Sequence, residues 1–339
     1  MARNIEDLDI LWLGYDGVHP AHRNFADSIG AEVVNLTIDS DPGWSNAWRY
    51  VENGIKQGHY DYVICNEGPS LRSGAPMKFY SWLKPGESNT KVIRYLANAN
   101  YYFITQGDGA RPYFNRFVAN FVDGGIANSK FTEKNGKKFI DGPIRTAIPP
   151  IRQELYDKLP KNGHNCGSRK ILSVGNNSWY KGKDLLVEAF QIVKEDYPEA
   201  ELILVGSETK EWSDKDNVKA LGRVKDVAPY YDKADVYVQS SRGDGFGVVV
   251  PEAMRSGIPT VVTETTGASE IVRDLDDNLI RDVDPKDIAQ GIKYYFELSE
   301  KRKKQLSETA RDLSEPFSPE NRKSQFREES EELVEELEK

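Results

Sequence analysis

The feature that most constrains the fold is an alternation of short apolar runs with helix-like segments, and this alternation occurs twice along the 339 residues. Strands buried on both faces of a parallel sheet read as short, continuous apolar runs, and helices connect one such strand to the next. The chain is longer than one hydrophobic core usually holds. The sequence therefore predicts an α/β fold with two domains, each built on an open, mostly parallel sheet.

The expected elements follow from these runs. In the first half we expect strands at 10–13, 32–38, 60–65, 91–96, 101–105 and 125–127, and helices at 20–30 and 48–57. In the second half we expect strands at 171–174, 202–205, 236–238 and 260–262, and helices at 185–195 and 253–256. The polar pair Asn128-Ser129 is typical of the start of a further helix.

Two stretches are candidates for the boundary between the halves. Pro149-Pro150 and the polar residues 160–168 form the best linker candidate. We place a first domain at 1–160 and a second at 168–317. Two open sheets that face each other would form an inter-domain cleft lined by the carboxyl ends of strands, where ligands usually bind.

The last segment, 318–339, is highly charged and carries Leu333, Val334 and Leu337 among glutamates. Apolar residues at this spacing predict an amphipathic helix that caps a domain and could pack back on the first domain. An acidic tail that binds a partner is the alternative.

Composition excludes some classes of function. The net charge is −9 at pH 7, so nucleic acid is a poor partner. The two cysteines, Cys65 and Cys166, are no disulfide framework and fit a reducing compartment. The first residues do not predict a signal peptide, and no apolar run approaches the ~20 residues that a spanning helix needs. We expect a cytoplasmic protein, with peripheral contact with the inner face of a membrane left open.

Residues 240–254 carry the strongest functional signal. The turn Gly245-Phe246-Gly247 lies between the acidic residues Asp244 and Glu252. Glycines let the backbone approach a ligand closely, and a loop that opens a helix directs N–H groups at an anion. Ionised carboxylates accept hydrogen bonds from hydroxyl groups. An anion beside several hydroxyls describes a sugar phosphate or a nucleotide sugar.

The segment belongs to a larger pattern between about residues 170 and 275. Its four stretches are Ser173-Val174-Gly175-Asn176 with Lys181-Gly182, the run 201–206, Leu221-Gly222-Arg223-Val224 with Ala234-Asp235-Val236, and residues 240–270. In this order they resemble the retaining glycosyltransferases of family 4 (glycosyl transferases group 1), which have the GT-B fold of two facing Rossmann-like domains. The first half resembles this family only in its layout.

The resemblance implies a donor site in the second domain. Lys181 and Asn176 would hold the donor diphosphate, Glu252 would bind the ribose hydroxyls, and Asp244 would bind the donor sugar. Lys181, Asp244 and Glu252 are the implied catalytic residues. The implied further donor contacts come from Arg223, Val224, Gly245, Phe246 and Gly247.

Three donor positions differ from the usual family pattern. Arginine is usual at position 176, glutamate at 244 and glycine at 268, whereas this chain has Asn176, Asp244 and Ala268. The alternatives without a role in ligand binding are an exposed surface lysine for Lys181 and a glutamate that stabilises a helix start for Glu252.

The first domain would bind the acceptor. Residues 14–17 match the position of the family's first glycine-rich loop, so we assign Gly17 to the donor site and Tyr15, Asp16 and His19 to the acceptor site. A plain turn with a histidine at a helix start is the alternative. The comparable stretch 94–98 lacks a histidine that many family members carry.

The expected function is retaining transfer of a sugar from a nucleotide-diphosphate sugar to a hydroxyl of a glycan, lipid-linked or small-molecule acceptor. No metal or further cofactor is expected, because no Asp-x-Asp pair is evident beside a strand. A non-catalytic nucleotide-sugar-binding subunit and a GT-B nucleotide-sugar epimerase stay open as alternatives. A phosphorylase would need a lysine that binds pyridoxal phosphate. An NAD-dependent dehydrogenase is disfavoured, since no Gly-x-Gly-x-x-Gly follows a strand. The nucleotide base, the sugar, the acceptor and the oligomeric state do not follow from the sequence.

Overall fold

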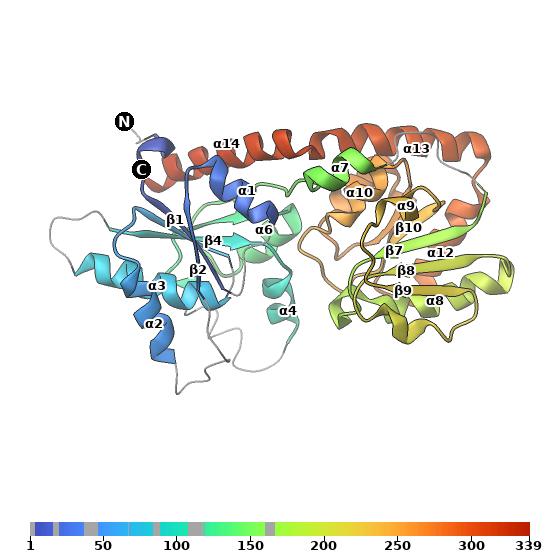
Figure 1. The fold of residues 1–339 in the computed structure, drawn as a ribbon, viewed down its shortest axis with the longest axis horizontal. Helices are drawn as coiled ribbons and strands as arrows, with labels where there is room; N and C mark the ends of the chain where they lie inside the picture. Colours follow the sequence, from blue (N-terminus) through green and yellow to red (C-terminus); the bar gives the residue numbers. More distant parts are fainter. Residues whose placement is uncertain are drawn as a thin grey trace. The chain divides into compact units, whose positions relative to one another are not determined.

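The structure, a computed structural model, describes residues 4–15, 20–36, 47–66, 68–83, 89–107, 117, 119–159 and 167–339. The chain divides into two compact units, residues 1–149 with 320–339 and residues 150–319. Each unit has a six-stranded sheet whose strands are all parallel, with helices packed against it (Figure 1). The predicted α/β fold class is thereby confirmed.

The first unit contains the sheet β2-β1-β3-β4-β5-β6. Its strands are β1 (Ile10–Tyr15), β2 (Glu32–Leu36), β3 (Tyr62–Cys65), β4 (Lys91–Leu96), β5 (Gly124–Ala127) and β6 (Ile144–Thr146). Its helices are α1 (Pro20–Ser28), α2 (Ala47–Lys56), α3 (Gly68–Trp82), α4 (Asn100–Gln106), α6 (Lys130–Gly136) and α14 (Pro319–Leu337), together with the 3-10 turn η1 (Ile5–Asp7).

Apolar side chains alternate between the two faces of this sheet and form two clusters. On one face, Trp12 and Tyr95 pack with Phe25 of α1 and Phe326 of α14. The rings of Phe25 and Phe326 stack with their centroids 4.2 Å apart. Helix α14 is therefore part of the core of the first unit, although it is the last helix of the chain.

The second unit contains the sheet β12-β11-β10-β7-β8-β9. Its strands are β7 (Lys170–Val174), β8 (Glu201–Val205), β9 (Val218–Gly222), β10 (Val236–Gln239), β11 (Thr260–Thr263) and β12 (Ile280–Arg281). Its α-helices are α7 (Gln153–Lys158), α8 (Lys183–Asp196), α9 (Ala228–Tyr231), α10 (Val249–Arg255), α11 (Ser269–Leu275), α12 (Pro285–Glu297) and α13 (Glu300–Ser314). Its 3-10 turns are η3 (Trp179–Lys181), η4 (Thr209–Trp212), η5 (Asp277–Leu279) and η6 (Glu315–Phe317).

The predicted strand at 101–105 is wrong, because Asn100–Gln106 forms α4. Aromatic residues favour strands, but packing outweighs this preference. The ring of Tyr101 stacks on that of Phe139 at 4.7 Å, and Tyr102 packs against Phe131 of α6 at 5.2 Å. The connection from β4 to its parallel neighbour β5 also has to cross back along the sheet, which favours a helix.

Other differences concern short or mixed segments. The strands β6, β9 and β12 are absent from the sequence prediction, because their residues alternate with polar ones and form no continuous apolar run. Helix α10 begins at Val249, earlier than predicted, and includes Pro251 in its first turn, where a missing N–H costs little. Residues 160–166 of the linker candidate lie outside the described residues. The boundary between the two compact units falls between Pro149 and Pro150.

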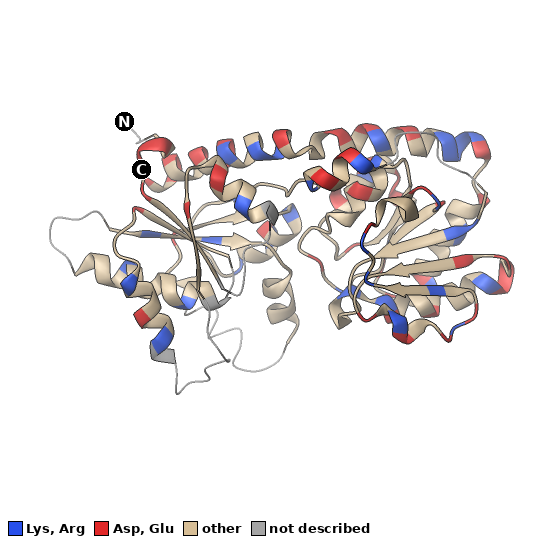
Figure 2. Ribbon diagram, in the orientation of Figure 1, with Lys and Arg blue, Asp and Glu red and all other residues tan. Residues whose placement is uncertain are grey.

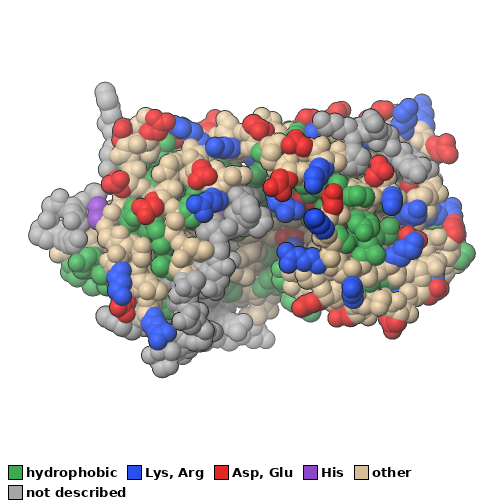
Figure 3. Space-filling view, viewed as in Figure 1, with side chains coloured by type: hydrophobic (Ala, Val, Ile, Leu, Met, Phe, Trp, Pro, Cys, Tyr) green, Lys and Arg blue, Asp and Glu red, His purple; other side chains and the backbone are tan. Residues whose placement is uncertain are grey.

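Charged side chains along the last two helices are partly grouped by sign. Basic residues gather at the start of α13, and the second half of α14 carries acidic residues alone (Figure 2). The face of the second unit seen in Figure 3, by contrast, mixes lysines and arginines with acidic residues. None of the described helices has the length and apolar character needed to cross a membrane.

Candidate active site

The strand order of the second sheet marks a place for a ligand. From β7 the chain proceeds through β8 to β9 on one side, and then returns to place β10 on the other side of β7. In open parallel sheets, ligands bind at the carboxyl ends of the strands where the order reverses. Here these ends carry Gly175 and Asn176 after β7, and Ser240 and Ser241 after β10.

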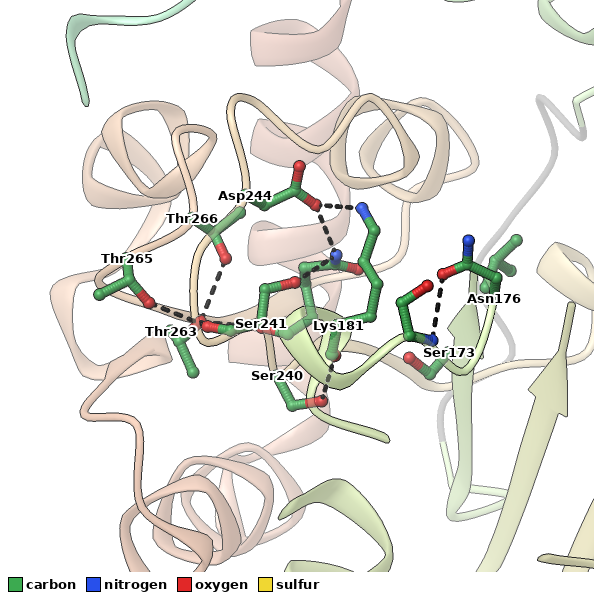
Figure 4. A network of polar contacts seen from close by, with 12 residues as sticks. Ser173, Asn176, Lys181, Ser240, Ser241, Asp244, Thr263, Thr265 and Thr266 are labelled. Atoms are coloured by element: carbon green, nitrogen blue, oxygen red, sulfur yellow. Dashed lines mark hydrogen bonds and ion pairs between the residues drawn. The ribbon is translucent and has the colours of Figure 1, made fainter. Parts of the chain in front are cut away.

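Lys181 and Asp244 meet at this place. Lys181 Nζ lies 2.5 Å from Asp244 Oδ2, and both side chains are largely buried (Figure 4). Gln239 Nε2 donates a second hydrogen bond to the same carboxylate oxygen at 3.0 Å. Burial alone would lower the pKa of Lys181, but the charge and hydrogen bond of Asp244 outweigh it and raise this pKa. The pair is thus a preformed, charged contact at the carboxyl edge of the sheet.

A second lysine, Lys183, lies beside this pair and does not figure in the sequence prediction. It is the first residue of α8, is 2% exposed, and donates a hydrogen bond to Ser173 Oγ at the end of β7. Burial, followed by the charge of Lys181, lowers the pKa of Lys183 to about 7, and Asp244 opposes this shift.

The glycine-rich loop is held in place by backbone contacts to the segment after β11. Asp244 N donates to Thr265 O at 3.1 Å, and Gly267 N donates to Asp244 O at 3.0 Å. Thr265 Oγ1 and Thr263 Oγ1 both donate to Ser241 O, which secures the start of the loop (Figure 4). These contacts fix the carboxylate of Asp244 before any ligand arrives.

Gly247 and Ala268, two positions in this loop region, differ in their backbone conformation. Gly247 has φ +87°, and a Cβ there would approach Asp244 Oδ2 at 3.4 Å, so glycine suits this position. Ala268, where the resemblance implies a glycine, has φ −68° and is unstrained.

Glu252 is a buried carboxylate in the first turn of α10. It is 5% exposed and accepts a hydrogen bond of 2.8 Å from Tyr231 OH. Burial raises the pKa of Glu252 to about 7, while Tyr231 and Arg152 act in the opposite direction. The ring of Tyr231 lies against Tyr237, whose hydroxyl donates to Gln239 Oε1 at 2.8 Å. The Lys181–Asp244 pair and Glu252 thus share one network of polar and aromatic contacts.

The structure places the other predicted donor residues around this network. Asn176 is exposed, and its Oδ1 accepts a hydrogen bond from Ser178 N at 3.3 Å. Arg223 is exposed and Val224 half-buried in the loop after β9. The ring of Phe246 is in the core, stacked on Phe317 at 5.7 Å, so only its backbone is placed to contact a ligand. Gly245 is buried beside it.

The residues predicted in the loop after β1 lie almost entirely beyond the described residues. The acceptor candidates Asp16 and His19 and the donor candidate Gly17 are outside these ranges. Tyr15 is the last residue of β1, where its backbone pairs with Leu36 of β2. Their roles stay predictions.

Lys183 and Gln239 are site residues that sequence reasoning missed. A polar residue at the end of an otherwise apolar strand, such as Gln239 after Val236-Tyr237-Val238, is a usable signal. Lys183 gives no such signal, because a lysine at a helix start is usually exposed.

Comparison with known proteins shows that most of the second unit is similar to one protein family. Residues 157–313 match the family model described as glycosyl transferases group 1. An uncharacterized glycosyltransferase of Haemophilus influenzae is 37% identical over 113 residues, which are 30% of this chain and 32% of the relative. The phosphatidyl-myo-inositol mannosyltransferase of Mycobacterium tuberculosis is 29% identical over 259 residues, 71% of this chain and 64% of the relative. The matches thus span less than two thirds of the length of these relatives.

Solved structures show the same fold over nearly the whole chain. The sucrose-phosphate synthase of Thermosynechococcus elongatus has a TM-score of 0.73 at 17% identity, over 96% of this chain and 99% of that one. Anabaena HepE in complex with UDP and glucose has a TM-score of 0.71 at 17% identity, over 95% and 98%. The resemblance found in the sequence is confirmed: residues 157–313 match the family model of glycosyl transferases group 1, within a chain that has the GT-B fold.

Proposed function

We propose that this protein transfers a sugar from a nucleoside-diphosphate sugar to an acceptor hydroxyl, with retention of configuration at the anomeric carbon. The observation that carries the proposal is the Lys181–Asp244 pair beside the buried Glu252, at the strand ends of a glycosyl transferases group 1 domain. The Anabaena protein of the same fold is described in complex with UDP and glucose, which supports a donor of this class.

Each polar group of the site has a role in this proposal. The ammonium of Lys181 neutralises the diphosphate as it leaves. Hydrogen-bond donors that are fixed in place in this way are the main source of electrostatic stabilisation for such a transition state. Asp244, held by Lys181 and Gln239, accepts hydrogen bonds from hydroxyls of the donor sugar. Glu252 accepts hydrogen bonds from the ribose. The proposal requires no metal and no cofactor other than the donor, and the acceptor is a carbohydrate or a lipid-linked molecule.

The first experiment identifies the donor. Thermal unfolding is measured with a panel of nucleoside diphosphates and their sugars, because a ligand that binds only the folded state raises the melting temperature. Release of nucleoside diphosphate from the best donor is then followed with a panel of acceptors. The coupling constant of the anomeric proton in the product reports retention.

The second experiment tests the residues. Lys181→Ala and Glu252→Ala should each lower donor turnover about a hundredfold or more, because each removes a charged group that faces the donor. Lys215→Ala and Glu195→Ala, at exposed positions of the same unit, are the matched controls. Turnover near the wild-type rate in both site variants would refute the assignment.

The same assays separate the two alternatives. A binding subunit would give a thermal shift with a nucleotide sugar but no turnover with any acceptor. An epimerase would convert or hydrolyse the nucleotide sugar without any acceptor.

A further inference from the structure

Lys183 presents an ammonium group whose hydrogen-bonding capacity is mostly unused. Among the described residues, its Nζ donates only to Ser173 Oγ, and Ser173 Oγ in turn donates to Val238 O at 2.6 Å. An ammonium group has three N–H donors, so two remain. Buried lysines are rare unless they are paired, so a buried ammonium with unused donors indicates a missing partner.

Open space adjoins this ammonium group. Gly175, the first residue after β7, has φ +136°, and a Cβ built there would meet one heavy atom within 4 Å, Lys183 Nζ at 3.9 Å. No other described residue has an atom within 4 Å of that position, apart from the two chain neighbours of Gly175. A small group that lies against Gly175 would therefore come within reach of Nζ.

The charges around this space favour an anion. Lys181 and Lys183 are two cations, and Asp244, the carboxylate beside them, is already paired with Lys181. Asn176, where an arginine is usual in the family that the sequence resembles, adds no charge. Lys183 also begins the fourteen-residue helix α8, whose positive dipole end disfavours a cation and favours an anion.

We propose that Lys183 is a second cation for the donor diphosphate, and that a diphosphate oxygen lies against Gly175 and accepts a hydrogen bond from Lys183 Nζ. This inference rests on the proposed function and adds to it a residue that replaces the arginine absent at position 176. Lys181 then neutralises the diphosphate from the side of Asp244, and Lys183 from beneath the loop after β7.

The protonation of Lys183 gives the proposal a distinctive readout. The charged groups that act on Lys183 are Lys181 and Asp244, and burial with the charge of Lys181 lowers the pKa of Lys183 to about 7. At pH 8 most of the Lys183 side chains are neutral in the free protein. A bound diphosphate favours the ammonium form and raises this pKa, so binding at pH 8 takes up close to one proton per site.

The experiment is isothermal titration of the whole protein with UDP, GDP and ADP, and with the corresponding nucleosides, at pH 8. Each titration is run in two buffers of different ionisation enthalpy, which gives the number of protons taken up. For the nucleoside diphosphate that binds most tightly, Lys183→Met should weaken binding about tenfold or more, as expected for the loss of a hydrogen bond to a charged group. Nucleoside binding should stay unchanged, and proton uptake should fall nearly to zero.

Two further variants complete the test. Lys215→Met, at an exposed position, should leave affinity and proton uptake unchanged. Asn176→Arg added to Lys183→Met should restore part of the diphosphate affinity, because it returns a cation to the same side of the loop. A purely structural role for Lys183 would not give this rescue.

The outcomes separate the two proposals. If the wild type binds a nucleoside diphosphate but Lys183→Met changes neither affinity nor proton uptake, the inference about Lys183 is wrong and the proposed function stands. If the wild type binds none of the nucleoside diphosphates, the proposed function fails, and this inference fails with it. Should Lys183→Met not fold, Lys183→Gln, which keeps a polar side chain without the charge, takes its place in the same titrations, and unchanged diphosphate affinity in that variant would overturn the role of Lys183.

Discussion

Glu252 shows that a single residue of the site can lower the free energy of unfolding. A carboxylate that is 5% exposed and has a pKa of about 7 is kept where its charge is poorly solvated. Tyr231 OH supplies one hydrogen bond, which does not offset burial. Strongly shifted pKa values cluster at functional sites, so this carboxylate is better explained by ligand binding than by stability.

We predict that Glu252→Gln stabilises the protein in a pH-dependent manner. A carboxyl whose folded pKa lies above its unfolded value stabilises the fold fully below pH 4.5, and this contribution is lost as the pH rises through about 7. Glutamine stays neutral and can still accept from Tyr231. The gain in unfolding free energy should therefore be small at pH 5 and reach about 3 kcal/mol at pH 8. Urea unfolding at the two pH values measures this, and equal gains at both would contradict it.

The sequence made some site residues predictable and left others hidden. Lys181, Asp244 and Glu252 follow from the order of four motifs, and the structure brings them into one network. Lys183 could not be predicted, because its burial depends on how the turn at Gly182 directs the start of α8 under β7. Local sequence carries no signal for such tertiary burial.

At the scale of elements, the turn between η3 and α8 positions both lysines. Gly182 has φ +62°, and a Cβ there would lie 2.0 Å from Ser240 O, in the segment after β10. Arg242, from the loop after β10, makes two hydrogen bonds to Asp184 of α8, at 2.8 and 2.6 Å. The two strand ends of the site are therefore joined through this turn.

We predict that Gly182→Ala destabilises the second unit far more than strain alone accounts for. Gly30→Ala is the matched control, because Gly30 has a similar φ of +68° but open space where the Cβ would be. The control should cost about 1 kcal/mol, the usual cost of placing alanine in the left-handed region. Gly182→Ala should cost several kcal/mol in urea unfolding and abolish nucleotide binding. Similar losses in the two variants would mean that contact with Ser240 O is unimportant.

Prediction of individual strands and helices from the sequence fails where a segment has no continuous apolar run or is fixed by its neighbours. Continuous apolar runs such as Leu202–Val205 were sufficient to identify β8, whereas β9, with the sequence Val-Lys-Ala-Leu-Gly, has no such run. Its pairing with β8 defines it, and pairing between two separate segments cannot be read from the local composition of either one. Helix α4 fails for the related reason that its aromatic residues are fixed by α6 and Phe139.

At the scale of the whole molecule, the chain completes its first unit with its last helix. Phe326, Leu333 and Val334 of α14 are buried in one apolar cluster with Trp12 and Phe25. Arg145 of β6 forms ion pairs with Glu329, Glu332 and Glu336 on the same helix. The predicted amphipathic character of this helix is confirmed by its buried and exposed residues.

We predict that Phe326→Ala destabilises the first unit by about 3–5 kcal/mol, the usual cost of removing a buried phenylalanine. Glu328→Ala, at an exposed position of the same helix, should change stability by less than about 0.5 kcal/mol. Nucleotide binding by the second unit, measured by titration below the unfolding temperature, should be retained in both variants. If Phe326→Ala left the unfolding curve unchanged, α14 would not be part of this core.

This return of the chain also determines what a single break in the backbone would do. The polypeptide passes from the first unit to the second near Pro149 and comes back near Glu320. A cut engineered between Pro149 and Pro150 would give two fragments, yet the larger one would keep α14 inserted in the core of the smaller. The pieces would therefore co-elute in native buffer and separate only in denaturant, as a non-covalent pair.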